Sequence, residues 1–446
     1  MQTQFVTIAG GGLAGSEATW QLAERGIAVA LYEMRPDHQT PAHKTDLLAE
    51  LVCSNSLKSN TPGAASWLVK EELRRCGSLL LKLAGENAVP GGSALAVDRD
   101  RFSAAVTAAI EQHPLIDLRR TELQEIPSQG LVLIATGPLT SDTLTRRLQS
   151  LTGTDSLAFY DSISPIVDAD TLNLRRIFRA SRYGKGGEDY LNCPMNEAEY
   201  RAFYEALRGA ETVETHSFED VRYFESCLPI EELARRGVDT LRFGPMKPVG
   251  LVDPRTGKQP YAVVQLRAEN LRFSSYNLVG FQNHLRFPEQ KRILRMIPGL
   301  ENAEFLRYGQ IHRNTYLNAP RLLAPDLSLK NAPHVFIAGQ LSGVEGYVEC
   351  IASGFLAGLA LAQRALGAAY ETPPRATALG SLVHFITHAD PSNYQPTNIS
   401  FDLLPPIEGL PRSIARDRKA RRERQCEQAL AAIEEWRAAQ MSYERI

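Results

Sequence analysis

Three glycines near the start of the chain have a spacing that suits phosphate binding. Gly10, Gly12 and Gly15 follow a short apolar run, Phe5–Ala9, in the pattern G-x-G-x-x-G, and a helical pattern of apolar residues comes after them. In such a loop the first glycine permits a tight turn, the second lets a pyrophosphate approach bare backbone, and the third lets helix and strand pack closely. The phosphates would lie on free N–H groups at the positive end of the helix.

A carboxylate completes this pattern at the end of the next apolar run. Glu33 follows residues 27–32 and comes eighteen residues after Gly15, where an acid usually holds the ribose hydroxyls of a dinucleotide. An acid at this place argues against a 2′-phosphate, and so favours FAD or NAD over NADP. The glycines alone would be weak evidence, since a flexible turn explains them equally well. Strand, helix, second strand and acid together predict a dinucleotide-binding βαβ unit.

Two of the six cysteines have neighbours that suit a reactive thiol. Cys53 lies in the long polar segment 34–66, and Cys227 lies in YFESCLPIEELARRG; both are close to helix-start signals. A helix N-terminus or a nearby cation lowers the pKa of a thiol and raises its thiolate fraction. The alternative for any single cysteine is a small buried hydrophobe. The cysteines that receive this second interpretation are Cys76, Cys193, Cys350 and Cys426.

Histidines and basic clusters in the second half are candidates for contacts with a planar ligand or with phosphates. His284 and His312 lie among aromatic residues, arginines and asparagines, which suits base stacking, although a lone histidine is more often structural. Basic clusters at residues 286–295 and 416–424 could contact phosphates, or could be solvated helix faces. The members of the first cluster that we expect to contact substrate are Arg286, Lys291 and Arg292.

The composition is that of an ordinary globular protein, long enough for two or three domains. Of its 446 residues 43% are hydrophobic and 22% charged, and a formal net charge of -2 neither demands nor excludes nucleic acid. Scattered cysteines without a C-x-x-C pair favour free thiols in a reducing cytoplasm and indicate no zinc-type metal site. The chain shows no signal-peptide pattern. The apolar run 351–366 is rich in Gly and Ala and predicts a buried helix, so no membrane span is expected.

Elements that would position these residues occur at both ends of the chain. A strand predicted over residues 130–137 ends in Ala-Thr-Gly, which suits a second close backbone approach to a ligand. A strand at 335–339 is followed by a Gly-rich turn and a Gly/Ala-rich helix. Between them the chain changes to aromatic and basic segments with alternating strands such as 261–267. The sequence therefore predicts an α/β protein with a discontinuous Rossmann-type domain and an inserted α+β domain. The expected boundaries are 1–180 for the first part of the Rossmann-type domain, 181–320 for the inserted substrate domain, and 321–446 for the second part with a basic C-terminal helix.

Local patterns predict further elements. Residues 67–83 have helical periodicity, and Asp98 is expected to cap the next helix. A short strand is expected at 123–126. Asn196 and Glu199 form a plausible capping box for a helix in the inserted domain.

Motifs spread along the chain resemble the TrmFO (Gid) family, the folate- and FAD-dependent tRNA (uracil-5-)-methyltransferases of bacteria. The matching segments occur in the expected order, from residue 5 to beyond residue 350, and this order is far more specific than the glycine loop alone. The segments are IAGGGLAGSEATWQLAERG, ELVCSNSLKS, RYFESCLPIEELARRG, RFGPMKPVGL, FQNHL, IHRNTYLNAP and FIAGQLSGVEGYVE.

The resemblance implies a one-carbon transfer to tRNA that forms 5-methyluridine (ribothymidine) from the T-loop uridine at position 54. In this family 5,10-methylenetetrahydrofolate donates the methylene, reduced FAD supplies the electrons, and NAD(P)H reduces the flavin. Cys227 resembles the nucleophile that adds to uracil C6, because uracil C5 is a poor nucleophile until a thiolate makes it enolate-like. Cys53 resembles the second cysteine, which we assign to acid/base work, most simply removal of the C5 proton. The target base must leave its stack to react.

The resemblance also assigns binding residues. It implies that the Rossmann-type domain is an FAD-binding domain and that the inserted domain meets tRNA. The expected FAD site comprises Gly10, Gly11, Gly12, Leu13, Ala14, Gly15, Glu33, Gly339, Gly346 and Tyr347. The residues expected in the folate pocket are His284, Arg313 and Asn314. A cytoplasmic location is expected, since the substrate is tRNA.

Two alternatives stay open. The first is the related MnmG (GidA-type) flavoprotein that modifies the wobble uridine of tRNA; that family shares the FAD loop and the folate, but it is longer and lacks the Cys227 segment. The second is a flavin-bearing RNA-binding protein without turnover. An assay for 5-methyluridine separates the three.

Overall fold

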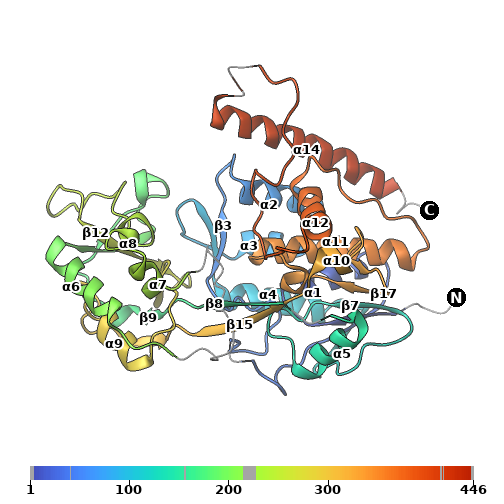
Figure 1. The fold of residues 1–446 in the computed structure, drawn as a ribbon, viewed down its shortest axis with the longest axis horizontal. Helices are drawn as coiled ribbons and strands as arrows, with labels where there is room; N and C mark the ends of the chain where they lie inside the picture. The colour runs from blue at the N-terminus through green and yellow to red at the C-terminus, as the bar shows by residue number, and fades with distance from the viewer. Residues whose placement is uncertain are drawn as a thin grey trace.

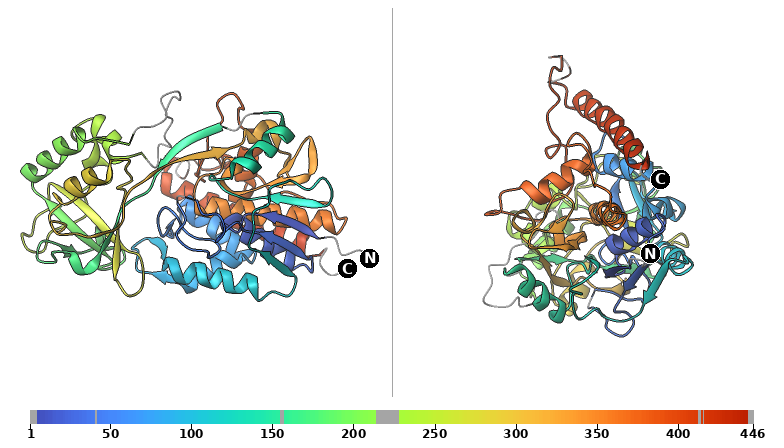
Figure 2. Two further views of the ribbon diagram at one scale, coloured as in Figure 1. Left: turned by 90° about the horizontal axis from the view of Figure 1, so that it is seen from below. Right: turned by 90° about the vertical axis from the view of Figure 1, so that its right-hand side faces the viewer.

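The described part of the protein contains two six-stranded sheets, a two-stranded ribbon and a small three-stranded sheet. The structure is a computed structural model, and the residues it describes are 5–40, 42–154, 157–213, 228–411, 414 and 416–442. The two large sheets lie in separate parts of the molecule (Figure 1). The ribbon, formed by β8 (Leu157–Ser162) and β15 (Ile311–Tyr316), runs between them (Figure 2). The chain therefore leaves and re-enters the first part along two paired strands.

The first sheet is parallel except for one edge strand. Its order is β16-β17-β7-β1-β2-β6, and β16 pairs antiparallel with β17. Its last parallel strand, β17, comes from the second half of the chain, so the predicted Rossmann-type α/β fold is confirmed, with its sheet assembled from both halves. The bounds are β1 Val6–Ala9, β2 Val29–Tyr32, β6 Ile116–Arg119, β7 Leu131–Ile134, β16 Ser328–Leu329 and β17 Ala332–Ile337.

Helices α1 (Leu13–Ala23) and α11 (Tyr347–Ala365) pack against each other beside this sheet. Their contact requires small residues, as the sequence predicted from its Gly/Ala-rich helix. A Cβ added at Gly354 would lie 2.2 Å from the carbonyl oxygen of Ala14, and one at Gly358 would lie 2.9 Å from Ala18 Cα. Both distances are too short for a side chain, so the glycines let the two backbones touch.

The helices after β2 depart from the prediction at one point. The helix expected over 67–83 is two helices, α2 (Ala65–Arg75) and α3 (Leu79–Glu86), because Gly77 takes a positive φ of 84° between them. The Ser78 side chain then accepts a hydrogen bond from the Leu81 N–H and starts α3. Each of the two helices therefore has its own end signal.

Two further local predictions have different outcomes. Helix α4 (Arg99–Glu111) begins as predicted, because the Asp98 carboxylate accepts a hydrogen bond from the Arg101 N–H. The strand predicted at 123–126 is wrong: these residues are irregular, and Leu123 packs against the apolar core from a loop. The short apolar run thus reflects burial rather than strand pairing.

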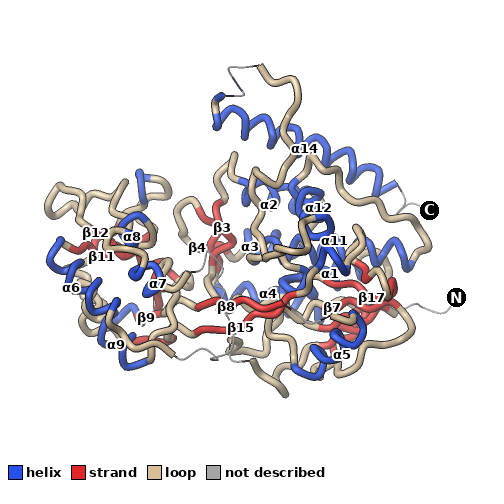
Figure 3. Tube along the Cα trace, viewed as in Figure 1, coloured by secondary structure: helices blue, strands red, loops and turns tan. Residues whose placement is uncertain are grey.

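The second sheet is antiparallel, with the order β10-β11-β12-β13-β9-β14. All seven residues of β12 are buried, so this strand is covered on both faces rather than half-exposed as its alternating sequence suggested. Helices lie around these strands (Figure 3). The strands are β9 Ile166–Asp168, β10 Phe178–Arg179, β11 Tyr190–Met195, β12 Ala262–Ala268, β13 Ser275–Leu278 and β14 Phe305–Arg307. The helices are α6 Glu197–Arg208, α7 Ile230–Arg235, α8 Thr240–Phe243 and α9 Phe287–Leu294.

The capping box predicted for α6 is present, because the Asn196 side chain and the Glu199 side chain each accept from the other's backbone N–H. The second sheet takes in β9, which precedes the boundary expected at residue 181. The domain boundaries therefore stay a prediction, with β9 placed by its pairing on the inserted side.

The remaining elements complete the first part. A small sheet joins β3 (Ser56–Ser59), β4 (Ala88–Val89) and β5 (Ala94–Val97). Helices α12 (Ala378–His388) and α14 (Arg418–Ser442) both pack on α2. Among the residues that the structure describes, no helix is long and apolar enough to cross a membrane, and no group of three or more His, Cys, Asp or Glu side chains could hold a metal ion.

Candidate active site

Two cavities share a wall in the first part of the molecule. The first cavity, with about 1080 Å³ of empty space, lies where β1, β2, β7 and β17 end. The second, with about 1100 Å³, lies between the loop after β2, the start of α11 and β15. The residues that line both are Val52, Pro138, Leu139, Gln340, Tyr347 and Cys350. A ligand long enough to pass these residues would occupy both cavities.

The glycine loop forms the floor of the first cavity, and each glycine has a distinct steric reason. Gly10 has a φ of 99°, and a Cβ there would lie 2.6 Å from the carbonyl oxygen of Ala135. A Cβ at Gly15 would lie 1.8 Å from the carbonyl oxygen of Gly10, so helix and strand pack as closely as the spacing predicted. Gly12 has open space around it and stands at the N-terminus of α1. This leaves bare backbone and the positive helix end for a pyrophosphate.

Glu33 fixes the glycine loop and faces the first cavity. Its Oε2 accepts a hydrogen bond from the Gly11 N–H at 2.9 Å, and its Oε1 accepts from the Arg35 N–H and Nε at 3.1 and 2.8 Å. Burial alone would raise the pKa of Glu33, but the hydrogen bonds and charge of Arg35 outweigh burial and lower it. These three donors use three of about four lone-pair positions of a carboxylate. Acceptor capacity therefore remains for a ligand hydroxyl.

Residues after β7, after β17 and before α11 contribute further backbone to the walls of the two cavities. Ala135, Thr136 and Gly137 after β7 line the first cavity, as the sequence predicted for a strand with this ending. Gly339 has a φ of 72°, and its N–H donates to Ser353 Oγ at 2.8 Å. Gly346 has a φ of 102°, caps α11 and lines the second cavity. The open backbone at Gly12, the spare acceptor at Glu33 and these glycines fit the adenosine diphosphate part of FAD.

Not every residue predicted for the FAD site lines these cavities. Leu13 and Ala14 line the first cavity together with Gly10, Gly12, Glu33 and Gly339. Gly11 and Gly15 do not line it: Gly11 donates its N–H to Glu33, and Gly15 allows the helix to pack closely on the strand. Both therefore shape the loop rather than the cavity surface.

Cys53 lines the second cavity and is held by Tyr347. The Tyr347 hydroxyl accepts hydrogen bonds from the N–H groups of Cys53 and Ser54, at 2.7 and 3.1 Å. The tyrosine belongs to the start of α11, so one side chain ties the thiol's loop to the wall between the cavities.

Two half-buried arginines flank the same loop. Arg99 donates to the carbonyl oxygen of Leu51 and pairs with Glu269 at 2.8 Å, and Arg307 donates to the carbonyl oxygen of Val52. Burial and the neighbouring charge of Arg99 lower the pKa of Arg307, whereas a negative charge on Cys53 would raise it. The surroundings of Cys53 are therefore cationic, which favours a thiolate.

The second predicted thiol, Cys227, belongs to residues 214–227, which lie outside the described residues. Of the other cysteines, Cys350 lines both cavities, but burial raises the pKa of its thiol. Burial likewise raises the pKa of Cys76 to about 12, on the far side of α2 from the cavities. Both thiols stay protonated at neutral pH, in keeping with a packing role.

The three residues predicted for the folate pocket lie in two places, β15 and the buried core beside Glu231. Asn314 lines the second cavity together with Cys53, and its backbone pairs with Phe159 in the ribbon. Arg313 is its neighbour in β15. His284 is buried instead: its Nδ1 lies 2.6 Å from the Glu231 carboxylate, which also accepts from the His284 backbone N–H. Of Asn314 and His284, whose side chains the structure describes, Asn314 is on the cavity wall and His284 is not.

The predicted basic contacts lie at helix α9 of the second sheet. Arg286 pairs with Glu211 at 2.9 Å, and Arg292 pairs with Glu289 at 2.6 Å, all near the surface. Lys291 is exposed between them. The structure brings the three bases onto one helix, but two of them already have acidic partners.

Several lining residues of the second cavity carry polar groups that the sequence analysis did not single out. Lys58 pairs with Glu349 at 2.9 Å, and Gln340 donates to Glu345. Lys58, Gln340 and Glu345 all belong to segments that resemble the TrmFO family, and that was the available signal. Arg99 and Arg307 offered none, because nothing local marks them as neighbours of Cys53.

Comparison with known proteins shows the family of the chain. A family model described as glucose inhibited division protein A matches residues 5–369. The methylenetetrahydrofolate–tRNA-(uracil-5-)-methyltransferase TrmFO of Solibacter usitatus is 59% identical over 439 residues, which cover 97% of this chain and 99% of that protein. The protein of the same name from Koribacter versatilis is 57% identical over 440 residues, which cover 98% of this chain and 99% of that protein.

Solved structures agree at the level of the fold. Two crystal forms of Aquifex aeolicus GidA align with TM-scores of 0.69 and 0.70 at 16% and 18% identity, and the alignments cover 98% and 96% of this chain and 75% of each GidA chain. With a family model that spans most of the chain and relatives that match it almost from end to end, the chain belongs to the glucose inhibited division protein A family and, within it, to the TrmFO proteins.

Proposed function

We propose that the protein methylates C5 of the T-loop uridine at position 54 of tRNA, with 5,10-methylenetetrahydrofolate as the one-carbon donor and NAD(P)H as the reductant of its FAD. The TrmFO relatives carry the name of this activity. When bound, reduced FAD supplies the electrons that turn the methylene into a methyl group. We propose a cytoplasmic location, since tRNA is the substrate.

The observation that carries the proposal is the wall shared by the two cavities. The first cavity offers Gly12 backbone and the Glu33 carboxylate to a dinucleotide, and the second contains the thiol of Cys53. Tyr347 lines both cavities and holds the Cys53 backbone. A ligand bound on the glycine loop thus extends toward the thiol, rather than away from it.

Each thiol has one task in the reaction. The Cys227 thiolate adds to uracil C6, which moves an electron pair to C5 and makes C5 the nucleophile toward the one-carbon unit. The Cys53 thiolate takes the proton from C5, and the electron pair of that C–H bond expels tetrahydrofolate from the one-carbon unit, which leaves an exocyclic methylene on C5. Reduction of this methylene to a methyl group, for which reduced FAD would supply the electrons, restores the C5–C6 double bond and expels Cys227 from C6. Arg99 and Arg307 support this step, because their charges favour Cys53 as a thiolate before it accepts the proton.

Two further groups of residues are proposed to bind the folate and the tRNA. We propose that His284, Arg313 and Asn314 form the folate pocket; the position of Asn314 on the second cavity supports this, and Gln282, two residues before His284 in the chain, also lines that cavity. We propose that Arg286, Lys291 and Arg292 contact tRNA from the inserted domain.

The test is a methylation assay with the FAD-loaded protein, methylenetetrahydrofolate, NAD(P)H and an unmodified tRNA transcript. The expected product is 5-methyluridine at position 54. Modification of the wobble uridine instead would favour the MnmG-type activity, and binding of tRNA without any product would favour a non-catalytic protein.

A pair of variants tests the thiol. Cys53→Ala should retain FAD and tRNA binding but lose turnover, whereas Cys76→Ala, which removes a half-buried thiol remote from both cavities, should methylate at the wild-type rate. An unchanged rate in Cys53→Ala would refute the acid/base role.

A further inference from the structure

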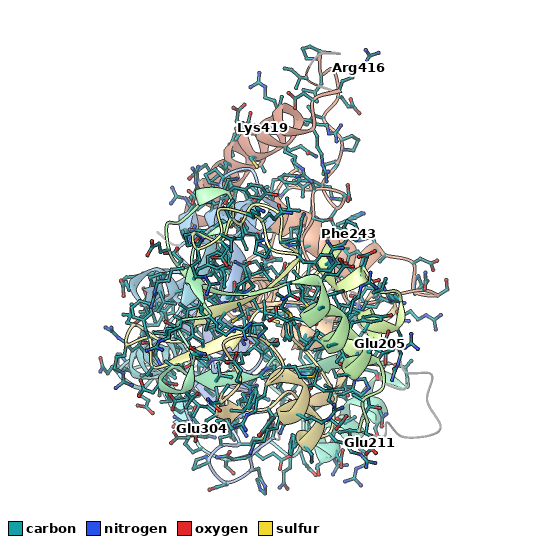
Figure 4. The ribbon with its side chains drawn as sticks, turned by 90° about the vertical axis from the view of Figure 1, so that its left-hand side faces the viewer. Glu205, Glu211, Phe243, Glu304, Arg416 and Lys419 are labelled. Atoms are coloured by element: carbon teal, nitrogen blue, oxygen red, sulfur yellow. The ribbon has the colours of Figure 1, made fainter. Side chains whose placement is uncertain are left out.

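Helix α14 is anchored at one end and projects at the other. Cys426, Ala429, Ile433 and Trp436 are buried along the helix from its third turn onward, and Trp436 Nε1 donates to the Glu371 carbonyl oxygen at 2.9 Å. The first two turns, residues 418–424, are exposed or half-buried. Figure 4 shows the labelled Arg416 and Lys419 at the outer end of this helix, away from the body of the protein. The helix therefore extends well beyond the surface that stabilises it.

The projecting turns carry charges that oppose helix formation. Residues 418–424 contain five bases and one acid. Bases at the start of a helix face the positive end of its dipole, and like charges three or four residues apart repel each other, as Arg418, Arg421 and Arg422 do. Solvation alone does not explain such a segment, because a mixed-charge sequence would be solvated equally well and form a more stable helix. An anionic partner would remove both penalties.

Two acids of this region, Glu423 and Glu427, lie beside bases that do not line the groove described below. Glu427 pairs with Arg424 at 2.6 Å, and Glu423 approaches Lys419 at 3.8 Å. Arg418, Arg421 and Arg422 instead line a groove of about 1170 Å³ between α14 and residues 401–410. Asp402 is the one acid among the described residues that line it. The groove is thus the positive side of the helix.

The groove contains an aromatic ring as well as arginines. The Arg422 guanidinium lies over the Phe401 ring, 5.1 Å from its centre. A guanidinium that lies over a ring still has N–H donors available for phosphate oxygens, which it can bind in pairs.

The groove lies next to the second cavity. Asn398 lines the second cavity and Phe401 lines the groove. Three residues of extended chain span at most about 10 Å, so the two sites are neighbours. In Figure 1 the free end of α14 points to the side on which the second sheet lies. A polyanion with one unit in the second cavity would therefore pass close to Arg418, Arg421 and Arg422.

We propose that this groove binds phosphates of the tRNA backbone beside the nucleotide whose base enters the second cavity. The proposal rests on the proposed function for its polyanion. Arginine forks bind phosphate oxygens in pairs, and each phosphate contact adds to the salt dependence of binding. The carboxylates of a polyglutamylated folate are a second anion source for the same arginines, and the experiment separates the two.

The experiment compares two triple variants of the full-length, FAD-loaded protein with equal loss of charge. The groove variant is Arg418→Gln, Arg421→Gln, Arg422→Gln; the control variant is Arg416→Gln, Lys419→Gln, Arg424→Gln, which changes the same basic segment, at and just before the start of α14, outside the groove lining. Glutamine keeps helix propensity, and loss of like-charge repulsion favours the helix, so circular dichroism and flavin absorbance should match wild type in both. Binding of an unmodified tRNA transcript is measured at several salt concentrations, and KM is measured for polyglutamylated methylenetetrahydrofolate.

The groove variant should bind tRNA at least about tenfold more weakly than the control variant. Because three phosphate contacts are lost, the slope of log K against log salt should become less steep by about 2. The KM for the folate should stay unchanged. Equal tRNA binding by the two variants would overturn the proposal, and so would a rise confined to the KM for polyglutamylated folate. If the wild type binds tRNA through the groove but forms no 5-methyluridine, the proposed function fails while the groove assignment stands.

Discussion

The two large sheets are surrounded by different kinds of packing. Around the parallel sheet, glycines and alanines bring backbones into contact, as at Gly15 and Gly354. Around the antiparallel sheet, aromatic and aliphatic side chains such as Tyr200, Phe203 and Phe281 fill the core, and paired charges cover the surface. Close backbone packing leaves a cavity of defined shape for a small ligand. A side-chain core under a charged surface supports contact with a large partner. Changes in the first region should therefore affect flavin binding, and changes in the second should affect tRNA with the flavin retained.

The largest effect on methylation is expected from Cys227→Ala, in the segment of the sequence between α6 and α7. Without its nucleophile the protein should lose methylation by at least about 1000-fold, while flavin absorbance stays at the wild-type level. Methylation of a tRNA transcript reports activity, and the absorbance band of the flavin at about 450 nm reports bound cofactor; both are measured on one sample. A yellow protein that still methylates would remove the nucleophile assignment; a colourless one would contradict the division between the regions.

In the first region the largest effect is expected from Gly354→Ala. The new Cβ would lie 2.2 Å from the Ala14 carbonyl oxygen, so α1 and α11 must separate at a cost of about 3 kcal/mol or more. The control is Gly85→Ala in α3, where the added Cβ meets nothing within 4 Å and better helix propensity should stabilise by about 0.5–1 kcal/mol. The melting temperature and the flavin content should fall in Gly354→Ala and not in Gly85→Ala. Equal melting temperatures would show that the helix contact tolerates expansion.

Glu33→Ala should lower both flavin affinity and stability. The change leaves the Gly11 N–H and part of the buried Arg35 guanidinium without an acceptor, at a cost of about 3 kcal/mol. Flavin retention after gel filtration and urea unfolding measure the two effects. Glu24→Ala, at an exposed position of the same helix–strand unit, is the matched control. Undiminished flavin in Glu33→Ala would exclude Glu33 from the site.

The same carboxylate predicts a pH dependence. Its pKa in the folded protein lies below the ordinary value of 4.5, so the unfolded chain takes up the proton first as the pH falls. Its contribution to the free energy of unfolding is therefore complete above pH 4.5 and is lost as the pH falls through the folded pKa. Urea unfolding between about pH 6 and about pH 3 should show a shallower loss in Glu33→Ala than in wild type. Parallel curves would mean that other groups carry the acid sensitivity.

The smallest effect is expected from the triple variant Arg286→Ala, Lys291→Ala, Arg292→Ala. Two of these bases already have acidic partners, so tRNA binding should weaken by only about two- to fivefold, with a flatter salt dependence. The control is the triple variant Arg201→Ala, Arg208→Ala, Lys258→Ala, which removes the same charge from exposed positions of the inserted domain. If the two triples bind tRNA alike, the cluster at α9 is a solvated face.

The glycine loop could be predicted from sequence because each of its residues answers a local steric requirement. Gly10, Gly12 and Gly15 stand at fixed steps between one strand and one helix, and Glu33 ends the next strand. The burial of β12 on both faces could not be read from its alternating pattern, since Gln265 donates to Asn192 in β11 and Arg267 donates to Asn55, 212 residues away in the chain. Burial on both faces depends on elements far away in the chain.

The charged surroundings of Cys53 could not be predicted for the same reason. Arg99 reaches the carbonyl oxygen of Leu51 across 48 residues, and Arg307 reaches Val52 across 255. His284 shows the converse: its aromatic and amide neighbours suggested a planar ligand, but the nearby Glu231 carboxylate binds it in the core. Local sequence identifies a thiol or an imidazole, and the tertiary fold decides what it meets.

Because β17 comes late in the chain, the two large sheets can be completed only at different times during synthesis. All strands of the antiparallel sheet lie between Ile166 and Arg307, whereas the parallel sheet must wait for β17, which begins at Ala332. As the chain leaves the ribosome, the inserted part is complete while the Rossmann-type sheet still lacks β16, β17 and the helix that packs on α1. The nascent protein therefore has the part that we propose for tRNA contact before it has a complete place for its flavin, and cofactor capture follows late in maturation.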